Sequence, residues 1–143
     1  MPVMIWSGRL AIISVLFLIL FSCSEKPEKL IYGIIPAVTQ MDTLNGGIEL
    51  SSGWSVLPTE NVEDLANELQ VFFKDKLSLE IENREMPSKT IFLLEFPDKE
   101  YGREGYRLKV KRNNVVIEAA GPIGISRGIS SLKQLILLNG KDG

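Results

Sequence analysis

The chain has 143 residues, of which 45% are hydrophobic and 24% are charged, and its formal net charge is −2. These values are typical of a globular protein with room for one domain, and they give no electrostatic reason to expect nucleic acid as a partner. There is no histidine and only one cysteine. This composition excludes Ser-His and Cys-His nucleophile systems, histidine-ligated metals, thiolate zinc clusters and intrachain disulfides.

An apolar block extends from residue 10 to residue 21 and is broken by a single serine. It is shorter than the roughly 20 residues that a membrane-spanning helix needs, so we expect residues 1–22 to be a secretory signal peptide. Ser22 and Cys23 then resemble a bacterial lipobox, in which cleavage falls between the two residues and the cysteine is acylated. The alternative is an uncleaved hydrophobic anchor with an incidental thiol.

Residues 24–29 contain no apolar side chain, so we expect residues 23–30 to form a solvated tether between the lipid on Cys23 and a folded domain over 31–140. The protein is then an exported lipoprotein, held in a membrane through acylated Cys23, in the bacterial periplasm or at the cell surface.

The first part of the domain is typical of short strands, expected at 30–35, in a hairpin over 38–50, and at 54–57. In the last of these strands Trp54 alternates with Val56. This alternation favours a place in the core over an exposed position where the indole could stack on a sugar.

A helix is expected from Thr59, whose hydroxyl can cap the first turn, with Glu60 and Glu63 favoured by the helix dipole. Its apolar stripe comprises Val62, Leu65, Ala66, Leu69, Phe72 and Phe73.

In the second part, Asn113 and Asn114 predict a tight turn, and Gly121 with Pro122 ends the strand that follows. Gly140 is a candidate C-cap for the last helix. The expected elements are strands at 79–82, 90–96, 106–111 and 115–120, and a helix over 123–138.

Two stripes run along that last helix. The apolar stripe is Ile125, Ile129, Leu132 and Ile136, and the small one is Gly124, Gly128 and Ser131. Small residues would let the helix backbone lie close to the sheet. The glycine spacing is not that of the dinucleotide fingerprint, so a phosphate cradle is not expected. The elements together predict an α+β fold with a mainly antiparallel sheet and two helices packed on one face.

We expect most of the charged side chains to be exposed to solvent and to have no role in binding or catalysis. This applies to four carboxylates, Glu95, Asp98, Glu100 and Glu104, although a glycosidase needs a pair of carboxylates. It also applies to four basic residues on or beside a half-buried strand, Arg107, Lys109, Lys111 and Arg112.

Several segments, in order, resemble the N-terminal, non-catalytic domain of glycoside hydrolase family 20, the β-N-acetylhexosaminidases. The resemblance covers roughly residues 31–138. Its segments are Ile35-Pro36, Gly47–Leu50, Glu104–Leu108, Val116–Ala120, Gly124–Gly128 and Leu132–Leu135.

The resemblance implies that the domain packs beside a (β/α)₈ barrel that holds the catalytic residues. In that family the substrate's 2-acetamido group attacks the anomeric carbon, a glutamate protonates the leaving oxygen, and the preceding aspartate orients the acetamido nitrogen. No Asp-Glu dipeptide occurs in this chain. No catalytic residue is therefore carried over, and no cofactor or metal ligand is expected.

The sequence thus predicts the accessory domain of a lipid-anchored β-N-acetylhexosaminidase, as a fragment or truncated product that lacks the barrel. Two alternatives stay open: a free-standing lipoprotein module that binds a protein or glycan, and the accessory domain of another glycosidase family.

Overall fold

The computed structural model describes residues 33–34, 39–42, 47–81, 87–97 and 100–140. The chain divides into two units, residues 1–30 and 31–143, and every described residue belongs to the second unit. The expected signal peptide, the cleavage site at Ser22 and Cys23, and the tether lie outside the described residues.

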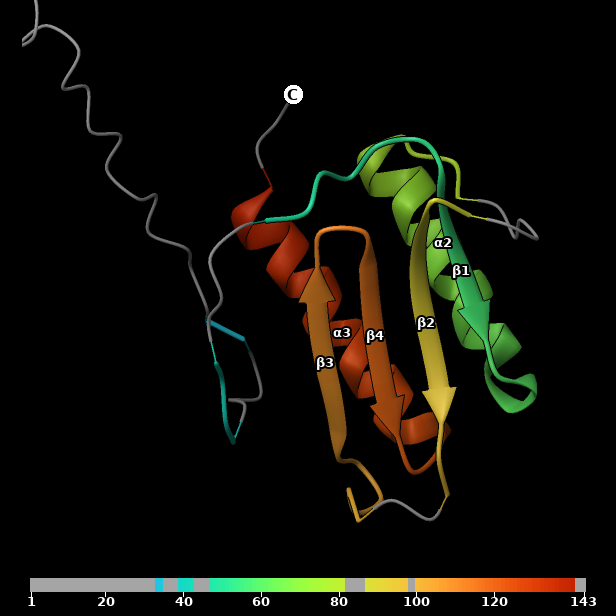
Figure 1. Cartoon of the computed structure of the whole chain (residues 1–143), viewed down its shortest axis with the longest axis vertical. Helices are drawn as coiled ribbons and strands as arrows, with labels where there is room; N and C mark the ends of the chain where they lie inside the picture. Colours follow the sequence, from blue (N-terminus) through green and yellow to red (C-terminus); the bar gives the residue numbers. More distant parts are fainter. Residues whose placement is uncertain (1–32, 35–38, 43–46, 82–86, 98–99, 141–143) are drawn as a thin grey trace, which may run out of the picture. The chain divides into compact units, whose positions relative to one another are not determined.

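The described elements follow one another as a strand, two helices, three strands and a helix (Figure 1). They are β1 Trp54–Pro58, η1 Glu60–Val62, α2 Glu63–Leu77, β2 Lys89–Glu95, β3 Tyr106–Lys111, β4 Asn114–Ala119 and α3 Pro122–Asn139.

The sheet has the strand order β1-β2-β4-β3 and is mixed. β1 pairs with β2 in parallel, β2 pairs with β4 in parallel, and only β3 and β4 are antiparallel. The expected mainly antiparallel sheet is therefore wrong, although the α+β class is confirmed. The helix α2 connects β1 to β2. Parallel strands need such a crossover, because the chain must return to the end of the sheet where β1 began before β2 can run in the same direction.

Two expected strands are not formed by the described residues. Residues 47–50 and 79–81 have no strand pairing. At the second place Ser78 adopts a left-handed conformation with φ 53°, and Leu79 donates its N–H to Phe73 O, so these residues cap α2 instead. Leu79 and Ile81 still pack against the core, which explains why their alternation resembled a strand.

Thr59 does not cap a helix with its hydroxyl. Its Oγ1 accepts a hydrogen bond from the N–H of Glu95 at 3.2 Å, and its own N–H donates to Leu93 O at 2.9 Å. Thr59 thus extends the bonding between β1 and β2, and the 3₁₀ helix η1 leads into α2.

The β3–β4 turn falls one residue earlier than expected. Lys111 pairs with Asn114, so Arg112 and Asn113 form the turn and Asn114 already belongs to β4. Among the described non-glycine residues only Ser78 has a positive φ, so this turn does not use the left-handed conformation that the asparagines allow.

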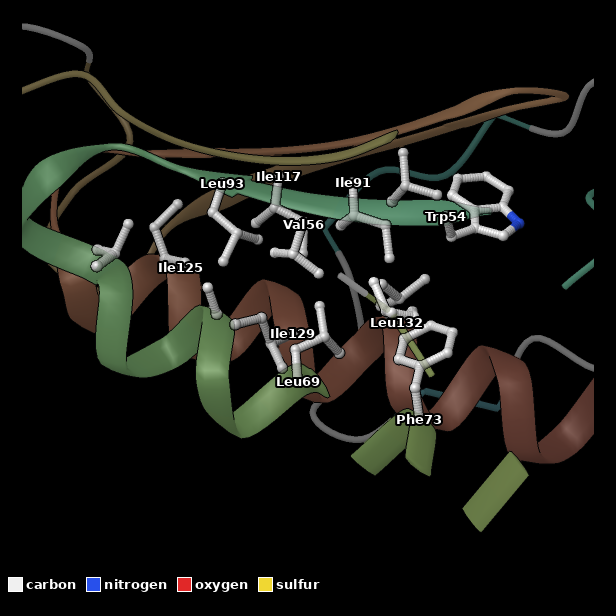
Figure 2. Packing of buried hydrophobic residues seen from close by; sticks show 14 of the residues in the cluster. Trp54, Val56, Leu69, Phe73, Ile91, Leu93, Ile117, Ile125, Ile129 and Leu132 are labelled. Carbon is white, nitrogen blue, oxygen red and sulfur yellow. The ribbon is translucent and has the colours of Figure 1, made fainter. Parts of the chain in front are cut away.

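Both helices cover the same face of the sheet, as expected (Figure 2). Alternate residues of β1, β2 and β4 and one stripe of each helix supply the core between them. Its fully buried large side chains are Trp54, Val56, Val62, Leu69, Phe73, Ile91, Leu93, Val115, Ile117, Ile125, Ile129 and Leu132.

The small stripe of α3 lies against the sheet, as the sequence predicts. A Cβ atom on Gly124 would lie 2.6 Å from the Cβ of Ala119, and one on Gly128 would collide with Ile117 Cγ2. Only glycine leaves room for the helix backbone at these two positions. At the next position of the stripe, Ser131 forms a hydrogen bond with Tyr106.

Candidate interaction surface

The carboxylates considered for glycosidase chemistry lie in separate settings. Glu104 is exposed and pairs with Arg127 of α3 at 3.2 Å. Glu95 ends β2, half-buried, and its Oε2 has no hydrogen-bond partner. Glu100 is exposed in the loop before β3, and Asp98 lies outside the described residues. No contact joins any two of the three described carboxylates, Glu95, Glu100 and Glu104, into an acid and partner pair.

Among the described residues, no group of three or more His, Cys, Asp or Glu side chains could hold a metal ion. Within the same residues, no helix is both long and apolar enough to cross a membrane.

A hollow of about 400 Å³ lies between the starts of α2 and α3. It is a surface groove with mainly apolar walls, and it does not enclose a sugar-sized ligand. Its lining residues are Asn61, Val62, Asp64, Leu65, Pro122, Ile123, Ser126 and Arg127.

The helix layer also carries exposed apolar side chains. Val71 of α2 is 57% exposed, and Leu137 of α3 is 60% exposed. Leu138 and Ile123 of α3 are exposed by 41% and 39%. We call these four residues together with the groove the outer helix surface. Because burial of apolar area drives most protein association, this surface is the candidate interface of the domain.

Trp54 is not available to stack on a sugar. It is 1% exposed, and its indole Nε1 donates to Glu49 O at 3.0 Å. The expectation that it belongs to the core is confirmed.

The opposite face of the sheet holds a small polar cluster. Tyr101 Oη donates to Glu118 Oε2 at 2.9 Å, and Lys109 Nζ lies 3.5 Å from Glu118 Oε1. The guanidinium of Arg107 lies 5.7 Å from the centre of the Tyr101 ring. Desolvation raises the pKa of Tyr101, the hydrogen bond and charge of Glu118 raise it further, and Arg107 opposes them.

Sequence reasoning missed Tyr101 in this cluster. The residue lies in a charged loop, 17 positions from Glu118, and no local periodicity connects the two. The basic residues Arg107, Lys109 and Lys111 are exposed on the same face, which confirms that they form the solvated side of β3.

A sequence profile described as glycosyl hydrolase family 20, domain 2, matches residues 31–141. The chain belongs to this family. The family resemblance of residues 31–138 is thereby confirmed. No curated protein matches this chain.

One similar solved structure is that of the family 20 exo-β-N-acetylglucosaminidase from Vibrio harveyi in complex with N-acetylglucosamine. It is 17% identical, with a TM-score of 0.47. The match covers 59% of this chain and 12% of that chain. The family 20 domain thus corresponds to a small part of the length of that enzyme.

Proposed function

We propose that this family 20 domain is the N-terminal accessory domain of a lipid-anchored β-N-acetylhexosaminidase. The family match over residues 31–141 carries the proposal, because it covers nearly all of the folded unit. The domain has no role in the chemistry itself. The catalytic barrel lies on the C-terminal side of this domain in the parent enzyme, and the present chain is a fragment or truncated product of it.

In the parent enzyme the outer helix surface packs against the barrel. Two observations support this assignment: Val71 and Leu137 are more than half exposed, and the groove beside Ile123 can accept a side chain from a partner. Interfaces between domains of one chain typically bury about 600 to 1,500 Å². The domain thus acts through stability, by covering apolar surface of the barrel.

The sequence of the DNA downstream of Gly143 gives the first test. A barrel that continues in frame or after a frameshift, with an adjacent Asp-Glu pair, agrees with the proposal. A stop codon with no such barrel downstream favours the free-standing lipoprotein module. A barrel of a different glycosidase family favours the accessory domain of that family.

The second test joins the domain to its barrel and replaces one exposed residue of α3. Leu137→Glu places a charge in the proposed interface, so it should lower the melting temperature of the joined protein and leave that of the isolated domain nearly unchanged. A matched control is Lys76→Glu, at an exposed position of α2. Equal effects of Leu137→Glu in both proteins would contradict the assignment of the interface.

The lipid anchor rests on Cys23, the only cysteine of the chain. Several acyl chains hold a protein far better than one, because each buried CH₂ contributes about 0.8 kcal/mol. Cys23→Ser should release the protein from membranes, and mass spectrometry of the mature protein should find acylated Cys23 as its first residue. Retention of Met1, or a variant that stays in the membrane fraction, would contradict the anchor.

A further inference from the structure

Positive charge is concentrated on the β3–β4 hairpin. Residues 105–117 contain four basic residues and no carboxylate, although the net charge of the whole chain is −2. All four basic residues are exposed. We call Arg107, Lys109, Lys111 and Arg112 the basic hairpin.

Three of these side chains share the sheet face that the helices leave open. Tyr106 and Leu108 pack toward the helix layer, so Arg107, Lys109 and Lys111 alternate to the other side. Figure 1 views the sheet with both helices behind it, and β3 forms one edge. The fourth basic residue, Arg112, lies in the turn at the end of the same strand.

One carboxylate shares this face, and its pairing is weak. Glu118 lies 3.5 Å from Lys109, and their side chains are 13% and 47% exposed. Because the Lys109 ammonium is the exposed partner and the distance is long, the pair contributes little free energy and Lys109 can bind another anion. Three basic side chains against one carboxylate leave the face positive.

The opposite side of the domain has the opposite charge. η1 and α2 carry five exposed acidic residues and two exposed lysines, Lys74 and Lys76, so their net charge is negative and an anionic surface would repel them. One of the acidic residues, Glu68, pairs with Lys133 of α3. The acidic residues are Glu60, Glu63, Asp64, Glu68 and Asp75. This asymmetry would turn the basic hairpin toward an anionic surface and the helix layer away from it.

We propose that the basic hairpin lies against the anionic phospholipid headgroups of the bilayer that carries the acyl anchor. The inference rests on the proposed anchor at Cys23. A fully extended tether over residues 23–30 reaches at most about 28 Å, so the domain stays close to the bilayer. A weak attraction then suffices, because tethering raises the effective concentration of the headgroups around the hairpin. The helix layer remains available for the catalytic barrel.

The test uses the full-length chain with vesicles of phosphatidylcholine alone or mixed with phosphatidylglycerol. The measurements are co-flotation and the rate at which an amine-reactive reagent labels each lysine. We expect slower labelling of Lys109 and Lys111 only on the phosphatidylglycerol vesicles, and recovery of the rate at high salt. Lys74 and Lys76, exposed on α2, should react equally on both vesicles.

Variants give the magnitude of the effect. Lys111→Gln and Arg112→Gln should each reduce the preference for phosphatidylglycerol vesicles about fivefold, which corresponds to about 1 kcal/mol per basic residue. Both residues are exposed, so the variants should keep the fold, and near-ultraviolet circular dichroism checks that they do. The matched control Lys76→Gln should leave the preference unchanged.

The other outcomes overturn the inference in distinguishable ways. Flotation with both kinds of vesicle but equal labelling of Lys109 overturns the inference and leaves the anchor standing. Flotation with neither kind overturns both the inference and the proposed anchor. Slower labelling with soluble polyglutamate, but not with phosphatidylglycerol vesicles, would assign the hairpin to an acidic protein instead. Flotation with phosphatidylglycerol vesicles alone would show that the hairpin binds anionic lipid without an anchor, and would overturn the anchor on which the inference rests.

Discussion

The hydroxyl oxygens of Tyr106 in β3 and Ser131 in α3 lie 2.6 Å apart and form a hydrogen bond between the sheet and the helix. Ser131 is 3% exposed, so its hydroxyl has little access to water as an alternative partner. The contact exists because Gly128 and Gly124, about one and two turns earlier, allow the helix to approach the sheet. It ties the edge strand to the helix layer.

Substitutions that remove the two partners of this hydrogen bond should have non-additive effects on stability. Tyr106→Phe leaves the hydroxyl of Ser131 buried without a partner, so we expect a loss of about 1 to 3 kcal/mol in the free energy of unfolding. The double variant with Ser131→Ala should lose less than the two single variants added together. Urea denaturation of the four proteins measures this coupling, and strict additivity would show that the contact contributes nothing.

Gly128→Ala should destabilise the domain even though alanine favours helices. The new Cβ would collide with Ile117 Cγ2 and lie 3.2 Å from Tyr106 Cδ2. Overpacking of this kind typically costs about 1 to 3 kcal/mol, which exceeds the helix propensity gained, about 1 kcal/mol. Gly121→Ser is the control, because a Cβ there meets nothing within 4 Å and serine is a good N-cap. A thermal melt that shows Gly128→Ala to be stabilising would refute the close approach of helix and sheet.

The same substitution at two positions of α3 should separate the buried face from the exposed one. Leu132 is 1% exposed, and Leu132→Ala should cost about 2 to 5 kcal/mol. Leu137 is 60% exposed, so Leu137→Ala in the isolated chain should change stability by about 0.5 kcal/mol or less. Equal shifts of the urea midpoint for the two variants would mean that the helix faces are placed incorrectly.

Tyr101 should ionise at higher pH than an ordinary tyrosine, whose pKa is about 10. Desolvation and the Glu118 carboxylate both favour the neutral phenol, so the pKa in the folded state is raised. The stabilisation from this contact is therefore complete below the ordinary pKa and is lost as the pH rises through the raised one.

The difference in phenolate absorbance between the wild type and Tyr101→Phe isolates this titration. Glu118→Gln keeps an acceptor for the hydroxyl but removes the negative charge, so it should lower the midpoint. A midpoint at or below the ordinary value in the wild type, or one that Glu118→Gln does not lower, would contradict the role of Glu118.

The 143-residue chain alone should not hydrolyse an aryl N-acetyl-β-glucosaminide above background. The reaction needs an acid carboxylate and an acetamido-orienting group around an enclosed sugar, and the groove between α2 and α3 is open. A chromogenic assay beside a full-length family 20 enzyme measures this. Turnover that survives repurification and is lost in Glu95→Gln or Glu104→Gln would overturn the accessory role.

Local periodicity was enough to predict much of this domain. The alternation in Tyr106–Lys111 identified β3, and the apolar and small stripes of α3 identified both the buried helix face and its close contact with the sheet. The burial of Trp54 followed from its alternation with Val56 in the same way. These features depend on which side of an element a residue faces, and the period of a helix or strand determines that side.

The candidate interface and the Tyr101 cluster were only partly predictable. The sequence identified Arg107 and Lys109 as solvated residues of one strand, but it did not show that Tyr101 joins them at Glu118. The outer helix surface likewise needed the exposure of Val71 and Leu137, since both lie outside the predicted apolar stripes and no sequence pattern marks them as an interface.

Strand order and direction were decided only by the tertiary structure. The side-chain period of a strand is the same in parallel and antiparallel pairs, so the sequence predicted strands at 90–96 and 115–120 but not that they are neighbouring parallel strands. The same limit explains the false strand at Leu79, where core packing and a helix cap reproduced the alternation. Periodicity records which side chains are buried, whereas backbone pairing depends on segments distant in the sequence that meet only in the folded domain.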